Sequence, residues 1–221
     1  MTTLAWTPAR MPQPRLLQGQ HGRLEPLDPA RHGADLWHTL HADDPALWDF
    51  LPYGPFAERA AFDAWLASLA QGRDPLFYAV VDPRDGRAVG QLSLMSIVPE
   101  HGSIEIGHVA FGGRMQRTPL ATEAVYLLMR EAFALGYRRL EWKCDNANTR
   151  SKRAAERLGL SYEGMFRQHR VVKGRNRDTA WFSLLDGEWP QVQAGFERWL
   201  AADNFDAEGR QRSALAVAPG K

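Results

Sequence analysis

Cysteine and net charge are both scarce in this sequence. Cys144 is the single cysteine among 221 residues, which excludes an intramolecular disulfide and a metal site of several thiolates. The 27 basic and 26 acidic side chains leave a formal net charge of +1. A polyanion is attracted by an excess of positive charge, which this chain lacks, so we predict that it binds no nucleic acid. We also expect no metal ion.

Long apolar runs are also missing. No stretch of about 18 apolar residues occurs, so we expect no membrane-spanning helix, and residues 1–15 hold three prolines but no apolar segment of a signal peptide. We therefore predict a cytoplasmic protein. The 44% hydrophobic and 24% charged residues are typical of one globular domain. We place this domain at 16–201, between an irregular arm at 1–15 and a flexible polar tail at 202–221.

Hydrophobic periodicity predicts an α/β fold with a mixed central sheet of about seven strands flanked by helices. A strand, a helix and a strand follow one another at 103–111, 120–135 and 138–145, which indicates a crossover and a parallel pair. The other strands are expected at 23–27, 77–81, 88–98, 162–172 and 179–185. The other helices are expected to begin at Pro29, to surround Phe62–Leu69, and to span 149–158 and 189–200.

The segment between the first strand of this crossover and its helix is the most informative. Thr118 is a good N-cap residue and Pro119 a good first helical residue, so the helix boundary is well defined. A strand, a short loop and a helix start can offer backbone amides to a pyrophosphate. A capped turn that binds no ligand fits the same residues, and this segment alone does not decide between the two.

Two runs of residues resemble the GNAT superfamily of acetyltransferases. Gln116-Arg-Thr-Pro-Leu-Ala121 is similar to the signature Gln/Arg-x-x-Gly-x-Gly/Ala, with Pro119 in place of the central glycine. Proline lacks an N–H, so one potential phosphate donor is lost, and the Thr118 hydroxyl is a candidate replacement. The second run resembles the CoA-binding segment of the RimJ/RimL-like branch at these residues: Asn148, Ser151, Leu158-Gly159 and Glu163-Gly164.

The resemblance implies a GNAT fold whose sheet splits between the fourth and fifth predicted strands. It further implies acetyl-CoA as acyl donor and direct transfer to a primary amine. Glu105 would be the base that accepts the amine proton, and Ser151 the acid that protonates the departing sulfur. The implied cofactor-binding residues are Val109, Phe111, Gln116, Arg117, Thr118, Leu120, Ala121, Thr122, Asn148 and Ser151.

Strand alternation leaves other roles open for two residues of the first crossover strand. It places Glu105 opposite Ile104 and Ile106, so an exposed carboxylate without function is an equal alternative. His108 is expected on the isoleucine face, either as a second proton relay or as a packed, hydrogen-bonded side chain. Ser151 is also compatible with an ordinary serine in a first helical turn.

Three further groups have two readings each. The basic run Arg167, His169, Arg170, Lys173, Arg175 and Arg177 is either a solvated hairpin or an attractor for an acidic acceptor or the CoA phosphates. The aromatic segment with Trp48, Phe50, Tyr53 and Phe56 is either core or the lining of an acceptor slot. Cys144 is expected to be a buried small hydrophobe rather than a nucleophile.

Alternative functions follow from the same features. A longer or acidic acyl donor such as succinyl-CoA would suit the basic run, and Pro119 motivates a non-catalytic acyl-CoA-binding module. The acceptor is expected to be a small amine or a protein N-terminus, and a homodimer is expected only by analogy with the family.

Overall fold

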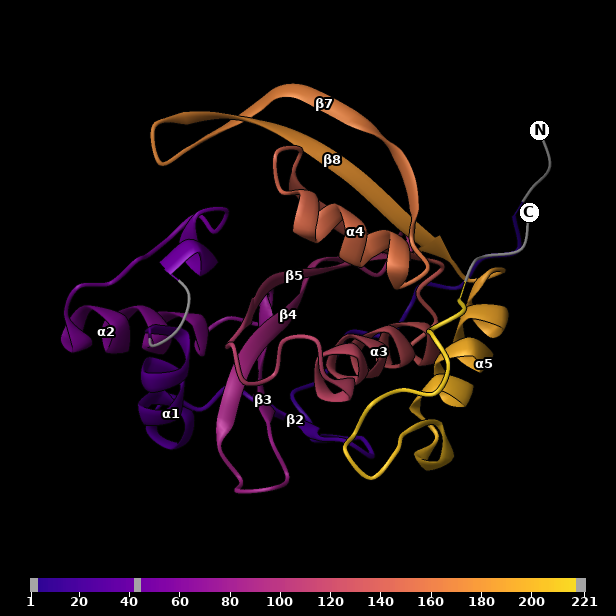
Figure 1. Ribbon diagram of the computed structural model, residues 1–221. Coiled ribbons are helices and arrows are strands. Elements are labelled where there is room, and N and C mark those ends of the chain that lie inside the picture. Colours follow the sequence, from indigo (N-terminus) through magenta and orange to yellow (C-terminus); the bar gives the residue numbers. More distant parts are fainter. Residues whose placement is uncertain (1–3, 42–44, 218–221) are drawn as a thin grey trace.

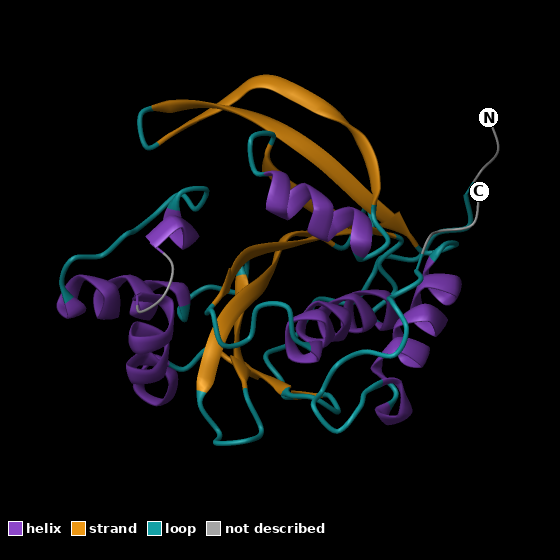
Figure 2. Ribbon diagram, viewed as in Figure 1, coloured by secondary structure: helices purple, strands orange, loops and turns teal. Residues whose placement is uncertain are grey.

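The computed structural model describes residues 4–41 and 45–217, which form one eight-stranded sheet with helices on both faces (Figures 1 and 2). The strand order is β1-β2-β3-β4-β5-β6-β8-β7. The strands are β1 (Leu17–Gln18), β2 (Arg23–Pro26), β3 (Leu76–Val81), β4 (Ala88–Val98), β5 (Ser103–Phe111), β6 (Arg139–Asp145), β7 (Ser161–Val172) and β8 (Arg175–Leu185). The predicted fold is confirmed, and the additional strand is the two-residue β1, which is too short to show alternation.

Alternate residues of β3 show how the helices divide between the two faces. Tyr78 and Val80 join the larger apolar core with α3 (Pro119–Ala134) and α5 (Trp189–Leu200). Phe77 and Ala79 join a second core with α1 (Pro29–His41) and α2 (Arg59–Leu69). Successive side chains of a strand point to opposite faces, so the two helix pairs cover opposite faces of the sheet. The remaining helices are α4 (Thr149–Arg157) and the short turns η1 (Pro45–Trp48) and η2 (Ala202–Asn204).

Parallel pairing occurs between β5 and β6, which α3 connects, and the other neighbouring strands of the described sheet are antiparallel. The parallel pair predicted from the strand, helix, strand order is therefore confirmed. A parallel pair needs a long crossover, and the helix that supplies it delivers its N-terminus to the end of β5.

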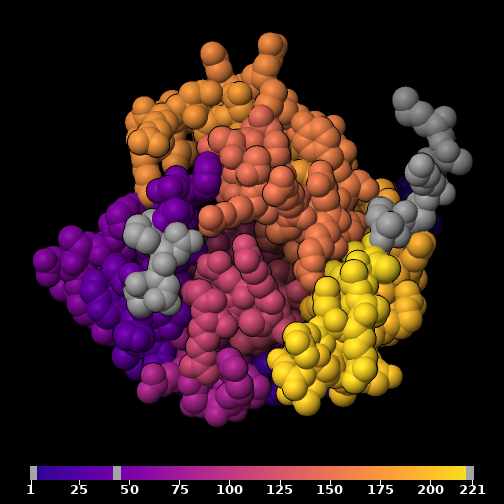
Figure 3. Space-filling view, viewed as in Figure 1, coloured from indigo at the N-terminus to yellow at the C-terminus, as the bar shows by residue number. Residues whose placement is uncertain are grey.

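The hairpin of β7 and β8 arches across the molecule towards the segment that joins α1 to α2 (Figure 1). At the hairpin turn, the Nζ of Lys173 donates a hydrogen bond of 2.7 Å to the carbonyl of Trp48. In the space-filling view the hairpin meets this segment, and the surface is recessed below the arch (Figure 3). The turn of the hairpin thus contacts the segment that joins α1 to α2.

Both ends of the described chain contact the domain. The Ala9 amide donates to the Pro99 carbonyl at 3.1 Å, and the Arg10 amide donates to the Leu135 carbonyl at 2.9 Å. Near the other end, Val217 is 4% exposed and belongs to the larger core. The limits of the domain at residues 16 and 201 remain a prediction, as does the flexibility of the tail.

Candidate active site

The ladder between β5 and β6 is short and ends inside the sheet. It pairs Ser103 with Arg139, Ile104 with Leu140, and Glu105 with Glu141. Beyond Glu105 and Glu141, β5 continues beside β4 and β6 continues beside β8, without further β5 to β6 pairing in the described chain. We call this opening the fork. Its facing strand edges carry backbone N–H and C=O groups that need partners, and an extended amide-bearing ligand can supply them.

A β-bulge bends β5 within the fork. Gln91 of β4 pairs with Ala110 and Ser93 pairs with Gly107, so His108 and Val109 together face one residue of β4. His108 has a φ of 53°, a left-handed conformation that is uncommon outside glycine. Such a bulge adds one residue to a strand and turns the side chains around it.

The bulge overturns the face predicted for His108. Ile104 and Ile106 lie in the core under α3, whereas the His108 ring contacts Phe77 and Tyr53 on the opposite face. Simple alternation fails because the inserted residue shifts the register of every side chain after Gly107. His108 therefore lies on the same face as Glu105 rather than on the isoleucine face.

Glu105 is buried at the point where the fork begins. Its side-chain Oε2 accepts hydrogen bonds from the Nζ of Lys143 at 2.9 Å and from the Oγ of Ser96 at 3.0 Å. Lys143 also forms an ion pair with Glu141 at 2.8 Å, and its Nζ lies 4.1 Å from the centre of the Trp181 ring. With 6% of its surface exposed, Glu105 is not the solvent-exposed carboxylate that alternation allowed.

Ser151 lies on the other side of the fork, in the first turn of α4. Asn148 caps this helix as predicted, because its Oδ1 accepts from the Ser151 amide at 3.0 Å. The Ser151 hydroxyl accepts a hydrogen bond of 2.9 Å from the indole Nε1 of Trp142. A hydroxyl that accepts one hydrogen bond can still donate its own hydrogen. Cys144 is buried nearby as expected, and burial raises the pKa of its thiol, while its hydrogen bond with Ser151 has the opposite effect.

The start of α3 lies at the end of β5. Pro119 is the first helical residue as predicted, and Thr118 occupies the N-cap position with extended dihedral angles. The Thr118 hydroxyl does not cap the helix: it donates to the Met115 carbonyl at 2.6 Å. The side-chain amide of Gln116 donates to the Phe111 carbonyl at 2.8 Å and holds the loop against β5. Two of the predicted binding side chains thus shape the loop itself.

The first backbone amides of α3 have no hydrogen-bond acceptor within the helix, so they can bind an anion. Leu120 and Ala121 are the second and third residues of α3, where no carbonyl four residues earlier belongs to the helix. The amide of Thr122 is instead placed to bond the N-cap carbonyl, and its hydroxyl accepts from Arg157 at 3.1 Å. The helix dipole adds partial positive charge at this end.

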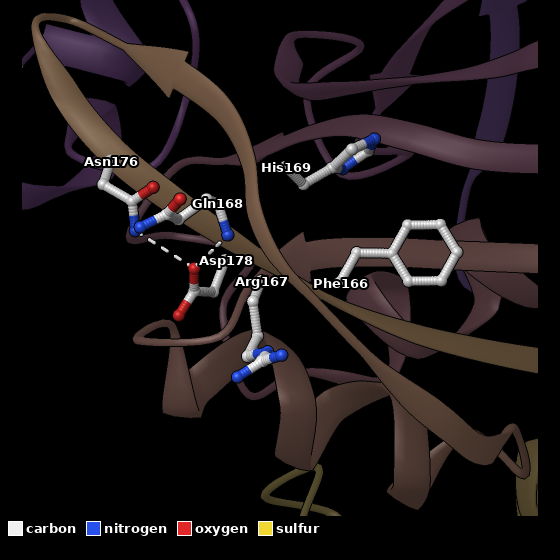
Figure 4. Close-up of a pocket in the computed structure, with 6 residues that line it drawn as sticks. All are labelled: Phe166, Arg167, Gln168, His169, Asn176 and Asp178. Atoms are coloured by element: carbon white, nitrogen blue, oxygen red, sulfur yellow. Dashed lines mark hydrogen bonds between the residues drawn. The ribbon is translucent and has the colours of Figure 1, made fainter.

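The hairpin of β7 and β8 also contains a β-bulge, which the sequence did not predict. Phe166 pairs with Thr179 and Arg170 with Arg177, so the segment 167–169 bulges out, and a pocket of about 760 Å³ lies beside it. Asp178 ties the bulge together, accepting from the Gln168 amide at 2.7 Å and from the Asn176 side chain at 3.0 Å. Figure 4 shows these three residues clustered on one side of the hairpin, with His169 and Phe166 directed away from them.

Several contributors to the site carried no sequence signal of their own. Lys143 and Ser96 hold Glu105 although they lie 38 and 9 residues away from it in the chain. From the sequence, Trp142 is recognisable only as a residue of the strand predicted at 138–145. Tyr53 was predicted among the aromatic residues, but its hydrogen bond to His108 required the bulge. These partners become recognisable only when the strand register is known.

Comparison with known proteins identifies the family. Residues 23–161 match the acetyltransferase (GNAT) domain family, and the chain belongs to it. It is therefore an acyl-CoA-dependent N-acyltransferase. Over 151 residues, 66% of this chain and 84% of the relative, it is 28% identical to the uncharacterized N-acetyltransferase p20 of Bacillus licheniformis.

Solved structures agree with this assignment. A GCN5-related N-acetyltransferase from Brucella melitensis superposes with a TM-score of 0.93 at 47% identity, covering 96% of both chains. RimL, a ribosomal L7/L12 alpha-N-protein acetyltransferase, superposes with a TM-score of 0.67 at 19% identity, over 77% of this chain and 94% of that chain. The second likeness shows a shared fold.

No helix within residues 4–41 and 45–217 is long and apolar enough to cross a membrane. The same residues contain no group of three or more histidine, cysteine, aspartate or glutamate side chains placed to hold a metal ion.

Proposed function

We propose that this protein transfers an acetyl group from acetyl-CoA directly to a primary amine, and that the fork holds the donor. The observation that carries the proposal is the end of the β5 to β6 ladder at Glu105, with Ser151 beyond it on one side and the start of α3 at its mouth. These features offer, in order, a proton acceptor, a hydroxyl donor and an anion-binding helix end.

The residues present fit the shape and charge of CoA. The unpaired strand edges of the fork suit the amide groups of a pantetheine arm, which resemble a strand backbone. The amides of Leu120 and Ala121, with the dipole of α3, suit a pyrophosphate. Pro119 lacks an N–H, but the N–H of the first helical residue is one of several that have no acceptor within the helix. The other N–H groups remain available. The substitution therefore leaves the anion site in place.

The proposed chemistry is a direct transfer with balanced proton movements. As the amine nitrogen forms a bond to the acetyl carbon, its surplus proton passes to Glu105, through a water molecule where the distance requires one. As the bond from carbon to sulfur breaks, the Ser151 hydroxyl gives a proton to the sulfur, and the Trp142 indole stabilises the oxygen that remains. Exchange with solvent then restores both side chains.

Both the acceptor and the acyl group of the donor have alternatives that can be compared by experiment. RimL acts, by its name, on a protein N-terminus, which supports this class of acceptor alongside small amines. Succinyl-CoA is the main alternative donor, because the hairpin beside the fork is basic. A non-catalytic acyl-CoA-binding module would bind the donor without turnover. The cytoplasmic location and the homodimer remain predictions.

Thermal unfolding with acetyl-CoA, succinyl-CoA and free CoA tests donor binding. A ligand at a hundred times its Kd stabilises the folded state by about 2.7 kcal/mol, which is readily measured. Mass spectrometry of small amines and of short peptides incubated with the preferred donor then tests transfer. We expect the largest shift with acetyl-CoA and a mass increase of one acetyl group on an amine. The absence of any shift would overturn the proposal.

A further inference from the structure

The bulge in β5 directs His108 towards the side of the fork that the donor-binding elements leave open. Ser151 and the start of α3 belong to the face that carries the larger core. His108 contacts Phe77, which belongs to the core under α1 and α2. The second substrate must reach the acetyl carbon from a side that CoA and these helices do not fill. The face that holds His108 is that side.

The ring of His108 is fixed in position. Its Nδ1 lies 2.9 Å from the Tyr53 hydroxyl, and the two rings are stacked with centroids 5.6 Å apart and planes 13° apart. Phe77 packs against the ring at 5.1 Å. Because Nδ1 is engaged, Nε2 is the nitrogen left for a ligand. The fixed ring thus presents one defined hydrogen-bonding atom.

The side chain of Gln91 is the polar neighbour of this hydrogen bond. Its side-chain amide lies beside the Tyr53 hydroxyl, it is fully buried, and neither of its polar atoms makes a well-formed hydrogen bond among the described residues. If Tyr53 turns its O–H towards the Gln91 carbonyl, Tyr53 accepts from Nδ1–H of His108. The Nε2 atom then carries a lone pair rather than a hydrogen.

The surroundings keep His108 uncharged. Burial lowers the pKa of the imidazole below its usual value. Tyr53 is the titratable group in contact with the ring, and burial raises the pKa of its hydroxyl above the ordinary range, so it stays neutral. Phe77 and Gln91 do not titrate, and Glu105 is the other ionisable residue of β5. In the tautomer with its hydrogen on Nδ1, the uncharged imidazole accepts a hydrogen bond at Nε2.

We propose that Nε2 of His108 binds the acceptor amine, accepting one of its N–H hydrogens so that the nitrogen lone pair faces the acetyl carbon. This inference rests on the proposed acetyl transfer and identifies the acceptor as an uncharged primary amine. An ammonium group has no lone pair to offer and is not activated at this position. Tyr53 is a positioning residue, because it acts through the ring of His108.

Steady-state kinetics of His108→Gln and Tyr53→Phe test the proposal, with His101→Gln as the matched control. His101 is exposed in the turn before β5, at the other end of the strand. Loss of a hydrogen bond to a buried group changes affinity by about 5- to 100-fold. We expect His108→Gln to raise KM for the amine by about that factor, and Tyr53→Phe to raise it less. KM for acetyl-CoA should stay within about twofold in both, and His101→Gln should resemble the wild type.

A pH profile adds a readout that a purely structural role would not change. The acidic limb of kcat/KM for the amine should report a histidine that titrates below its usual pKa, and His108→Gln should lose this limb. An amine KM within twofold of wild type in His108→Gln, or an equal rise of both KM values, would overturn the proposal. Failure of the proposed function looks different: the wild-type protein itself would then neither bind acetyl-CoA nor acetylate any amine.

Discussion

The indole Nε1 of Trp142 donates a 2.9 Å hydrogen bond to the hydroxyl of Ser151, joining β6 to α4 beside the fork. Trp142 is 6% exposed, so its N–H has little access to water. The bond fixes the serine oxygen and leaves the hydroxyl hydrogen to be directed elsewhere. A strand residue thereby orients the group that we assign as the acid.

Ser151→Ala should separate chemistry from binding. Removing a general acid typically lowers the rate by about 10²- to 10⁴-fold, and we expect kcat to fall within that range while the Kd for acetyl-CoA changes little. The orphaned indole N–H should cost about 1–3 kcal/mol of stability. Single-turnover acetylation measures kcat and calorimetric titration measures the Kd. Trp142→Phe keeps the hydroxyl but loses the N–H that binds it, so its kcat should fall less than that of Ser151→Ala. An unchanged kcat in Ser151→Ala would remove this residue from the mechanism.

Glu105→Gln tests the assigned base. The amide can still accept hydrogen bonds from Lys143 and Ser96, so the fold should persist, but it cannot take a proton. We expect kcat to fall by about 10²- to 10⁴-fold. Glu141→Gln is the matched control, because Glu141 pairs directly with Glu105 and shares Lys143. An equal loss of kcat in both variants would indicate that activity depends on the ion pair with Lys143 rather than on proton transfer to Glu105.

Gly112→Ala should destabilise the loop that leads to α3. A Cβ at this position would meet the Thr39 side chain and would lie 3.1 Å from the Val89 carbonyl oxygen. Overpacking of this kind costs about 1–3 kcal/mol, measurable as a lower urea midpoint. Gly187→Ala is the control, since a Cβ there meets nothing within 4 Å, and its midpoint should hardly move. Equal midpoints for the two variants would show that the Gly112 site can relax.

Glu163 should contribute to stability at neutral pH and lose that contribution in acid. Hydrogen bonds from Arg139 and then Ser183 lower the pKa of its carboxyl to about 2 from the usual 4.5. A lowered folded-state pKa stabilises the protein above pH 4.5, and the contribution disappears as the pH falls towards 2. The pair is partly exposed, so Glu163→Gln should cost only about 0.5–1 kcal/mol at pH 7. Urea titrations should show wild type and variant converging near pH 2; a constant difference would contradict the assignment.

The long strands and the crossover were predictable from sequence because they depend on local signals. Apolar alternation marks the long strands, and Thr118 with Pro119 marks the start of α3. These patterns reflect the geometry of single elements, and the resemblance of the segments around Gln116 and Ser151 to a known family added the fork. The structure confirms the elements and the parallel pair.

The details of the site depend on register, which local patterns do not encode. The bulge at His108 changes the face of the ring, and simple alternation along Gly107-His-Val109 does not predict this change. The contact of Lys143 with Glu105 arises only because β6 lies parallel to β5 at a particular offset. The hydroxyl of Thr118 donates to the Met115 carbonyl in the loop and does not accept from an amide of α3. Tertiary geometry thus decides which polar groups meet.

Calorimetric titration of acetyl-CoA into wild-type protein, Ala121→Glu and Ala121→Gln tests whether the start of α3 binds the pyrophosphate of the donor. Ala121 is the third residue of α3, where a glutamate is favourable for the helix, so the fold should be retained. A carboxylate there repels a pyrophosphate, whereas glutamine has the same size without the charge. We expect Ala121→Glu to weaken acetyl-CoA binding by at least about tenfold, or about 1.4 kcal/mol, beyond the effect of Ala121→Gln. Equal affinity of the two variants would contradict a donor site at the start of α3.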